Sequence, residues 1–181
     1  QAGRIGIFGG SNWSPARFAE ANAYAAAHGL QPMRILNNNL SLAVMERPVW
    51  AGCITSNTPG TLAYLRAGGV THLSWSSQAR GYFLPQALRS RLPADIGPEA
   101  CFGSAANAER RRRAETLAAR HGVAAHNIAT AWVLAQSFAS FALVGPRSPG
   151  EIASTLPSLA LALTPEEVGW LNLEGDGVLA G

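Results

Sequence analysis

Small polar residues follow four short apolar runs of the sequence, and their types and positions could do chemistry. The runs lie at 4–8, 32–39, 70–75 and 141–144 and predict strands. In parallel α/β folds, ligand-binding side chains lie just past the carboxyl ends of the strands. The segments at those ends are Ser11-Asn12-Trp13, Asn37-Asn38-Asn39, Trp75-Ser76-Ser77-Gln78 and Gly145-Pro146-Arg147-Ser148. Such residues suit hydrogen bonding and anion binding, although ordinary surface loops are polar too.

The segment after the fourth run has the clearest chemistry. Gly145, Arg147 and Ser148 lead directly into a predicted helix. Backbone N–H groups, a helix N-terminus and a guanidinium therefore come together where a phosphate could bind. The alternative is an ordinary capped helix with a solvated arginine. The residues alone leave both interpretations open.

The helices that must position these segments have recognisable ends. Ser14-Pro15 and Thr164-Pro165-Glu166-Glu167 are typical of helix starts, and Gly29 and Gly122 of helix ends. A long loop is predicted over 76–105, with a helical turn at 84–89, and loops of that length are usually functional. The predicted helices cover 15–28, 61–67, 107–121, 127–136, 149–159 and 165–173.

Strands and helices thus alternate four times. Each predicted strand is apolar nearly throughout, which is typical of parallel sheets covered on both faces. The sequence has no internal repeat beyond this alternation, no low-complexity tract and no obvious linker. It therefore predicts one α/β domain over residues 1–181.

The composition excludes several classes of protein. Of the 181 residues, 48% are hydrophobic and 14% charged, which excludes intrinsic disorder. No apolar stretch approaches the roughly 18 residues that a membrane span needs. Cys53 and Cys101 are too few for a disulfide scaffold and too far apart for a zinc knuckle, so we expect reduced thiols in a cytoplasmic protein. The start at Gln1 shows no signal peptide and indicates a piece of a longer chain or a processed product.

Four ordered segments give the chain a resemblance to a known family. They are GGSNWSPARFAEANAYAAAHGL at 9–30, LSWSSQARGYF at 73–83, IATAWVLAQSF at 128–138 and LVGPRSPGEIASTLPSLALALTPEEV at 143–168. Together they resemble the C-terminal half of an aldo-keto reductase. That family folds as a (β/α)8 barrel, TIM-barrel-like, and reduces aldehydes and ketones with NADPH. The resemblance implies that the four predicted strands are the fifth to eighth of such a barrel.

The resemblance implies a nicotinamide site at the first three strand ends. Ser11 and Asn12 match the family's Ser-Asn pair, which binds the nicotinamide carboxamide. Asn39 matches a glutamine after the sixth strand and is one methylene shorter. Trp75 matches the aromatic residue that stacks on the nicotinamide.

The resemblance also places the rest of a dinucleotide. Ser76, Ser77 and Gln78 match the segment that wraps the pyrophosphate, and Arg80 could pair with it. Gly145, Arg147 and Ser148 match the segment that holds the adenosine 2′-phosphate. Glu151 and Thr155 match positions that usually contact adenine. The implied cofactor is NADP. NAD is possible, because Arg147 precedes Ser148 where many members have a small residue followed by arginine.

No catalytic residue is assigned in this chain. The family protonates its substrate with a tyrosine assisted by lysine, aspartate and histidine from the second to fourth strands, which the chain lacks. The 14 lysine and arginine residues are all arginine, so the chain has no lysine. Tyr24 and Tyr64 are expected to pack within helices and His72 inside a strand, while Tyr82 in the long loop could contact a substrate.

The arginine run at 110–113 raises the possibility of nucleic-acid binding. On a helix, four consecutive residues spread around most of the circumference, and no aromatic residues interleave with them. A solvated face with Glu109 and Glu115 as neighbours is the preferred interpretation. We expect neither a nucleic acid nor a membrane as partner.

The preferred hypothesis is the cofactor-binding half of an NAD(P)H-dependent oxidoreductase acting on carbonyl substrates. The alternative is a non-catalytic nucleotide-binding or regulatory half-barrel that assembles with a partner. Four strands cannot close a barrel, which typically needs about 250 residues. The open edges near Arg4 and Phe141 predict association with a second copy or with the missing N-terminal half. The isolated chain is predicted to be inactive.

Overall fold

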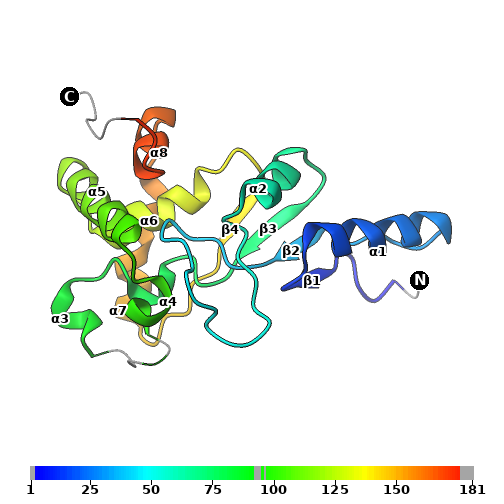
Figure 1. Cartoon of the computed structure of the whole chain (residues 1–181), viewed down its shortest axis with the longest axis horizontal. Helices are drawn as coiled ribbons and strands as arrows, with labels where there is room; N and C mark the ends of the chain where they lie inside the picture. Colours follow the sequence, from blue (N-terminus) through cyan, green and yellow to red (C-terminus); the bar gives the residue numbers. More distant parts are fainter. Residues whose placement is uncertain (1–2, 92–94, 96, 176–181) are drawn as a thin grey trace.

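The computed structural model describes residues 3–91, 95 and 97–175. Within them, four parallel strands form one sheet (Figure 1). The ends of the predicted domain, 1–2 and 176–181, lie outside the described residues, as do 92–94 and 96 of the predicted long loop. In sheet order and in chain order the strands are β1 (Gly9–Ser11), β2 (Ile35–Asn37), β3 (Thr71–Ser74) and β4 (Ser140–Ala142).

Helices follow each strand, which confirms the predicted α/β class. After β1 and β2 come α1 (Pro15–Ala27) and α2 (Pro59–Arg66). Between β3 and β4 lie η1 (Ala79–Gly81), α3 (Gln86–Arg89), α4 (Pro98–Phe102), α5 (Ala105–His121) and α6 (Ala125–Leu134). After β4 come α7 (Pro149–Thr155), η2 (Leu156–Ala160) and α8 (Pro165–Leu171). In Figure 1, α1 extends from one end of the molecule, and α5, α6 and α8 gather at the other.

Local capping sets the helix starts. The Ser14 hydroxyl accepts a hydrogen bond from the backbone N–H of Arg17 (3.2 Å), with Pro15 as the first residue of α1. Thr164 and Glu167 form the predicted capping box at α8, with bonds of 3.1 and 2.8 Å. Gly122 ends α5 in the left-handed conformation. Each of these helix ends depends on residues within about one helical turn, so the sequence predicts it without knowledge of tertiary contacts.

The first strand was predicted at 4–8, and this is wrong. The strand is Gly9–Ser11, while Ile5 and Ile7 are 67% and 63% exposed. A Cβ on Gly9 would lie 1.9 Å from the carbonyl oxygen of Ile35, so only glycine lets the chain approach β2 this closely. The apolar run before β1 is bonded to the segment that precedes β2: the N–H of Arg34 donates to the Phe8 carbonyl, and the Gln31 amide donates to the Gly6 carbonyl. The prediction that each strand is apolar nearly throughout is therefore wrong for β1, which consists of two glycines and a serine.

The predicted long loop over 76–105 contains more structure than one helical turn. It holds η1, α3 and α4, and α4 begins at a proline and buries Cys101 and Phe102 completely. Short turns of this kind carry no periodic pattern that would distinguish them from loop. Smaller differences are that α5 starts at Ala105, α6 covers Ala125–Leu134 and β4 starts at Ser140.

The described residues bury two apolar clusters. The smaller one joins the sheet to α1 and α2 through Phe18, Met33, Leu36 and Leu65. The larger one, called here the main core, lies among α4, α5, α6, α8 and the segment after β2. Its fully or almost fully buried members include Leu42, Tyr82, Phe102, Leu117, Ile128 and Leu171.

Helices cover only one face of the sheet. Leu36 and His72 are paired across β2 and β3 and are both fully buried. The intervening residues point to the other face, because side chains alternate along a strand. There Ile35 and Leu73 are only half-buried, and Phe141, paired with Leu73, is 56% exposed. Within the part of the chain described, this second face and the edge strands β1 and β4 are therefore open. The open edges agree with the sequence prediction, whereas the prediction of a sheet covered on both faces is wrong for these residues.

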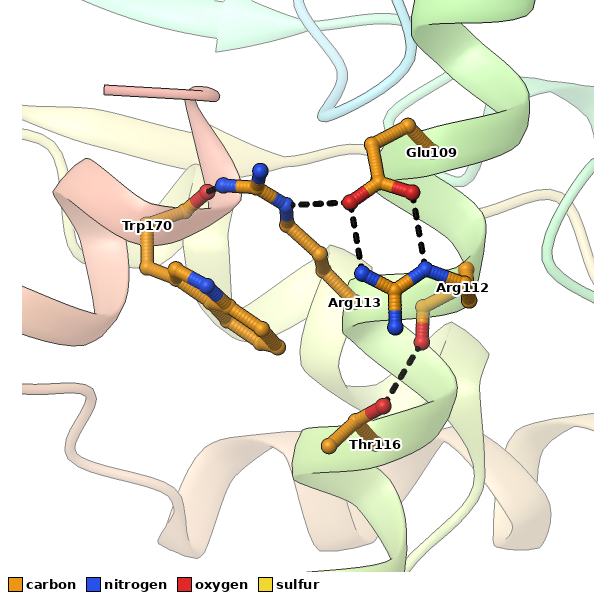
Figure 2. A network of polar contacts seen from close by, with 5 residues as sticks. All are labelled: Glu109, Arg112, Arg113, Thr116 and Trp170. Atoms are coloured by element: carbon orange, nitrogen blue, oxygen red, sulfur yellow. Dashed lines mark hydrogen bonds and ion pairs between the residues drawn. The ribbon is translucent and has the colours of Figure 1, made fainter. Parts of the chain in front are cut away.

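The arginine run has a structural role that the sequence did not reveal (Figure 2). Arg113 is buried, and it donates to the Trp170 carbonyl and to Glu109, each at 2.7 Å. Its guanidinium also lies 5.2 Å from the Trp170 ring centre. Hydrogen bonds from Arg112 and Arg113 lower the pKa of Glu109 to about 2. The expected solvated face is therefore wrong for Arg113, because α8 packs on that side of α5 and gives the guanidinium partners.

Candidate functional site

The ends of β2 and β3 remain paired beyond the strands themselves. An isolated bridge pairs Asn39 with Trp75 and continues the register in which Ile35 pairs with Thr71. A second bridge pairs Asn39 with Thr55, which lies in the β2–α2 loop (residues 38–58). Three segments that are distant in sequence thus meet at the carboxyl end of the sheet.

Ser11 is held by a residue that the sequence did not assign to the site. Its hydroxyl donates to the side-chain oxygen of Asn37 (3.1 Å), and the Asn37 amide donates to the carbonyl of Leu73 (2.7 Å). Asn37 thereby links β1, β2 and β3. Three consecutive asparagines at a strand end were visible in the sequence, but which of them spans the strands depends on the register.

Asn12 turns the chain away from β1. Its backbone is left-handed, with φ of 56°, a conformation that asparagine tolerates better than most residues. Its N–H donates to the Asn37 carbonyl, and its side-chain oxygen accepts from the N–H of Ile54, both at 3.0 Å. Asn12 is thus beside the other strand ends, and its oxygen is used to hold the β2–α2 loop.

Asn39 is fully buried, and its side chain is only partly satisfied. Its amide nitrogen donates to the Trp75 carbonyl (3.2 Å). Its side-chain oxygen has no hydrogen-bond partner among the residues that the structure describes. Such a buried acceptor costs free energy unless a ligand, water or another segment satisfies it.

Trp75 lies half-buried next to Asn39 and contacts the main core. Its indole N–H is also buried without a partner in the described part of the chain. The ring of Trp50, from the β2–α2 loop, lies on the ring of Trp75, with 4.8 Å between centres and 31° between planes. Trp50 carried no signal in the sequence, since it belongs to no motif.

The segment after Trp75 is tied to β4 and to α7. The Ser77 hydroxyl donates to the Leu143 carbonyl (2.7 Å). The Gln78 amide donates to the hydroxyls of Thr130 (3.1 Å) and Thr155 (3.3 Å). Two residues assigned to different parts of the dinucleotide, Gln78 and Thr155, are therefore bonded to each other.

Left-handed backbone recurs in this segment. Ser76 and Arg80 have φ of 48° and 55°, and both side chains are half-buried. Arg80 already has an interaction partner within the chain. A tight turn of this kind holds Ser76, Ser77 and Gln78 close to the strand end.

The segment after β4 is exposed and internally paired. Gly145 has open space around it, and Ser148 caps α7 by accepting from the N–H of Glu151 (3.2 Å). The Arg147 guanidinium donates to Glu151 at 3.1 and 3.3 Å, and its backbone N–H donates at 2.7 Å. These bonds lower the pKa of Glu151. The arginine is therefore largely exposed, and Glu151 is its partner in place of a phosphate.

Two titratable residues that the sequence offered as candidates, Tyr82 and His72, are buried in the protein. Tyr82 is buried beneath Arg111, whose guanidinium lies 4.6 Å from its ring centre, and burial raises its pKa. The suggested substrate contact of Tyr82 is wrong in this structure. His72 is fully buried as expected, bonded to the hydroxyls of Ser56 (2.9 Å) and Ser74 (2.8 Å), and burial lowers its pKa to about 4.

The strand ends do not coincide with an apolar groove that lies beside α1. A groove of about 700 Å³ lies between residues 3–8, α1 and residues 30–33, and is mostly apolar. Of the strand-end segments only Trp13 lines it. Among residues 3–91, 95 and 97–175 no cluster of three or more metal-binding side chains occurs. In the same residues, no helix has the length and apolarity needed to cross a membrane.

Comparisons with known proteins place the chain in a family. The model of the Aldo/keto reductase family matches residues 1–172. A comparison with curated proteins gives no match. Among solved structures, the thermostable aldo-keto reductase Tm1743, in complex with the inhibitor epalrestat, is similar in fold at 19% identity and a TM-score of 0.61. The match covers 93% of this chain and 48% of that one, so the chain spans about half the length of this relative. On the family match, which extends over nearly all of its length, the chain belongs to the aldo-keto reductase family.

Proposed function

We propose that this chain is the cofactor-binding half of an NAD(P)H-dependent carbonyl oxidoreductase. Its four βα units would form the C-terminal half of a (β/α)8 barrel. The observation that carries the proposal is the pairing of Asn39 and Trp75 at the carboxyl end of the sheet, each with a buried polar atom that no described residue satisfies.

These residues fit a nicotinamide. A carboxamide N–H would donate to the side-chain oxygen of Asn39 once binding uncovers that oxygen, which other residues cover in this structure, and the flat ring suits stacking on the indole of Trp75. The Ser11 hydroxyl, which donates to Asn37, keeps a lone pair for the carboxamide. When bound, such a cofactor supplies the hydride of carbonyl reduction.

We expect the other predicted residues to continue the site from the end of β3 to α7. Ser76, Ser77, Gln78 and Arg80 would flank the pyrophosphate. Gly145, Arg147, Ser148, Glu151 and Thr155 would flank the adenosine. The bond between Gln78 and Thr155 supports one continuous site, because it joins the two groups at 3.3 Å. In this site the chain's own residues bind and orient the cofactor.

The proton for carbonyl reduction must come from elsewhere. The chain has no lysine to activate a tyrosine, and Tyr82 is buried. We propose that an N-terminal half-barrel, or a second copy of this chain, packs against the open face and edges of the sheet. A non-catalytic nucleotide-binding half-barrel is the second candidate, favoured by this lack of an acid.

Calorimetric titration of the chain with NADPH and NADH tests the proposal. The expected result is binding that Trp75→Ala weakens about 2- to 10-fold, from the loss of one aromatic contact. Tyr24→Ala, which removes an exposed aromatic ring from α1, should leave the affinity unchanged. Absence of binding at millimolar cofactor would refute the site. Turnover of a simple aldehyde with NADPH separates the two candidate functions, and the chain alone should show none.

A further inference from the structure

The ring of Trp50 lies against the ring of Trp75, to which we assign nicotinamide stacking. The two indole rings are 4.8 Å apart at their centres. Trp75 contacts the main core, whereas Trp50 is 49% exposed and outside both apolar clusters. A large aromatic side chain is thus held half in solvent against the ring to which we assign nicotinamide stacking.

The chain holds Trp50 in this place at the tip of an anchored loop. The tip is residues 50–52, all exposed, and it lies between the buried side chains of Val49 and Cys53. The tip is closed by a bond from the N–H of Cys53 to the carbonyl of Trp50 (3.3 Å), with Gly52 in the left-handed conformation. The N–H groups of Glu46 and Arg47 donate to the Cys101 carbonyl and fix the loop on its other side.

The spacing of the rings leaves no room for a third. A flat ring between two others needs planes roughly 7 Å apart, twice the contact distance of carbon atoms. A nicotinamide therefore cannot enter between Trp50 and Trp75 as they lie. The ring surface of Trp75 that Trp50 covers becomes available only when the tip moves.

We propose that Trp50 is a built-in competitor for the ring site of Trp75, displaced when a nicotinamide ring binds. The inference rests on the proposed function and adds a residue to that site. Because only three exposed residues separate two buried anchors, the tip can swing while the rest of the loop stays in place. Trp50 thereby lowers the affinity of the site for flat rings.

The experiment compares Trp50→Ala with Trp75→Ala by calorimetry, using nicotinamide mononucleotide, NADH and NADPH as probes. Trp50→Ala should bind all three about 2- to 10-fold more tightly than the natural chain, by the stacking that it removes. The affinity of Trp50→Phe, which keeps a ring at this position, should lie between those of the natural chain and Trp50→Ala. Leu88→Ala, similarly exposed on α3, should change nothing.

Far-UV circular dichroism supplies an independent readout. Stacked indoles give an exciton couplet, which should be lost in Trp50→Ala and in Trp75→Ala and reduced by ligand in the natural chain. Binding that Trp50→Ala weakens or leaves unchanged would overturn the inference and leave the proposed function standing. Absence of binding in both the natural chain and Trp50→Ala would overturn both. Thermal unfolding of each variant verifies that it is folded.

Discussion

The two ends of the molecule differ in how completely they bury their apolar residues. The helical end, formed by α4, α5, α6 and α8, encloses the main core, and Phe102, Leu117 and Leu171 are fully buried there. The sheet end, formed by β1 to β4 with residues 3–8, α1 and α2, lies on the other side of the molecule (Figure 1), and α1 and α2 pack against one face of its sheet. Its exposed large apolar residues include Ile5, Ile7, Phe8, Phe141, Leu143 and Val144.

This difference shows that the helical end completes its own core and the sheet end does not. Exposed apolar surface along sheet edges promotes association with other strands. The polar residues of the proposed cofactor site lie at the carboxyl ends of this same sheet. The half of the molecule to which we assign ligand binding is therefore also the half whose apolar residues are left exposed.

The largest expected effect comes from truncating one leucine at each end of the molecule and comparing the losses of stability. Leu117→Ala, in the helical end, should lower the free energy of unfolding by about 2–5 kcal/mol, because it leaves a cavity in a closed core. Leu143→Ala, at a residue 42% exposed beyond β4, should cost under about 1 kcal/mol. Urea unfolding of both variants measures this. Equal losses would mean that the sheet end is covered in solution.

A pH titration tests whether the covered face of the sheet is as closed as the main core. Burial lowers the pKa of His72 from 6.5 to about 4 in the folded chain. Between these values the unfolded chain binds a proton that the folded chain does not. Stability is therefore full above pH 6.5 and falls by about 3 kcal/mol as the pH drops to 4. His72→Gln should flatten this part of the profile, and His28→Gln, on the exposed end of α1, should not.

Association of the chain tests the bare face directly. The natural chain should associate at micromolar concentration in sedimentation experiments. Phe141→Ser should weaken this about 10- to 100-fold, from a burial free energy of roughly 1.5–3 kcal/mol. Leu159→Ser removes an even more exposed side chain, from η2, and should have little effect. If the natural chain were a monodisperse monomer that unfolds cooperatively, the four strands would be stable without association, which would contradict this prediction.

The smallest expected effect concerns the exposed ion pair after β4. Glu151→Gln should leave the thermal stability almost unchanged, because exposed ion pairs contribute little. It should raise the affinity for NADPH relative to NADH by less than about tenfold, because Arg147 then has no carboxylate partner that competes with the 2′-phosphate of NADPH. Arg147→Ala should shift the ratio the other way. If the affinities for NADPH and NADH changed by the same factor, Arg147 would not be part of the proposed adenosine site.

Much of the fold could be predicted because its signals are local. Helix starts at Ser14 and Thr164 depend on residues within one turn, and the polar segments after each strand predict a site at one edge of the sheet. The ordered segments that resemble aldo-keto reductases extend this prediction to a cofactor. The first strand was misplaced because apolar character alone predicted it at 4–8. Close pairing with β2 selected Gly9, a residue without a side chain.

The sequence by itself determined the order of strands and helices, the polar residues at the strand ends and the lack of lysine. Only the tertiary structure decided which of these residues are already engaged. Asn37 joins three strands, Gln78 bonds to Thr155, Arg113 is buried under Trp170, and Trp50 covers Trp75. Each of these contacts joins residues more than twenty positions apart. Neither spacing nor residue type specifies such a contact, because it forms only when the register of the sheet and the packing of α8 and the loops bring the partners together.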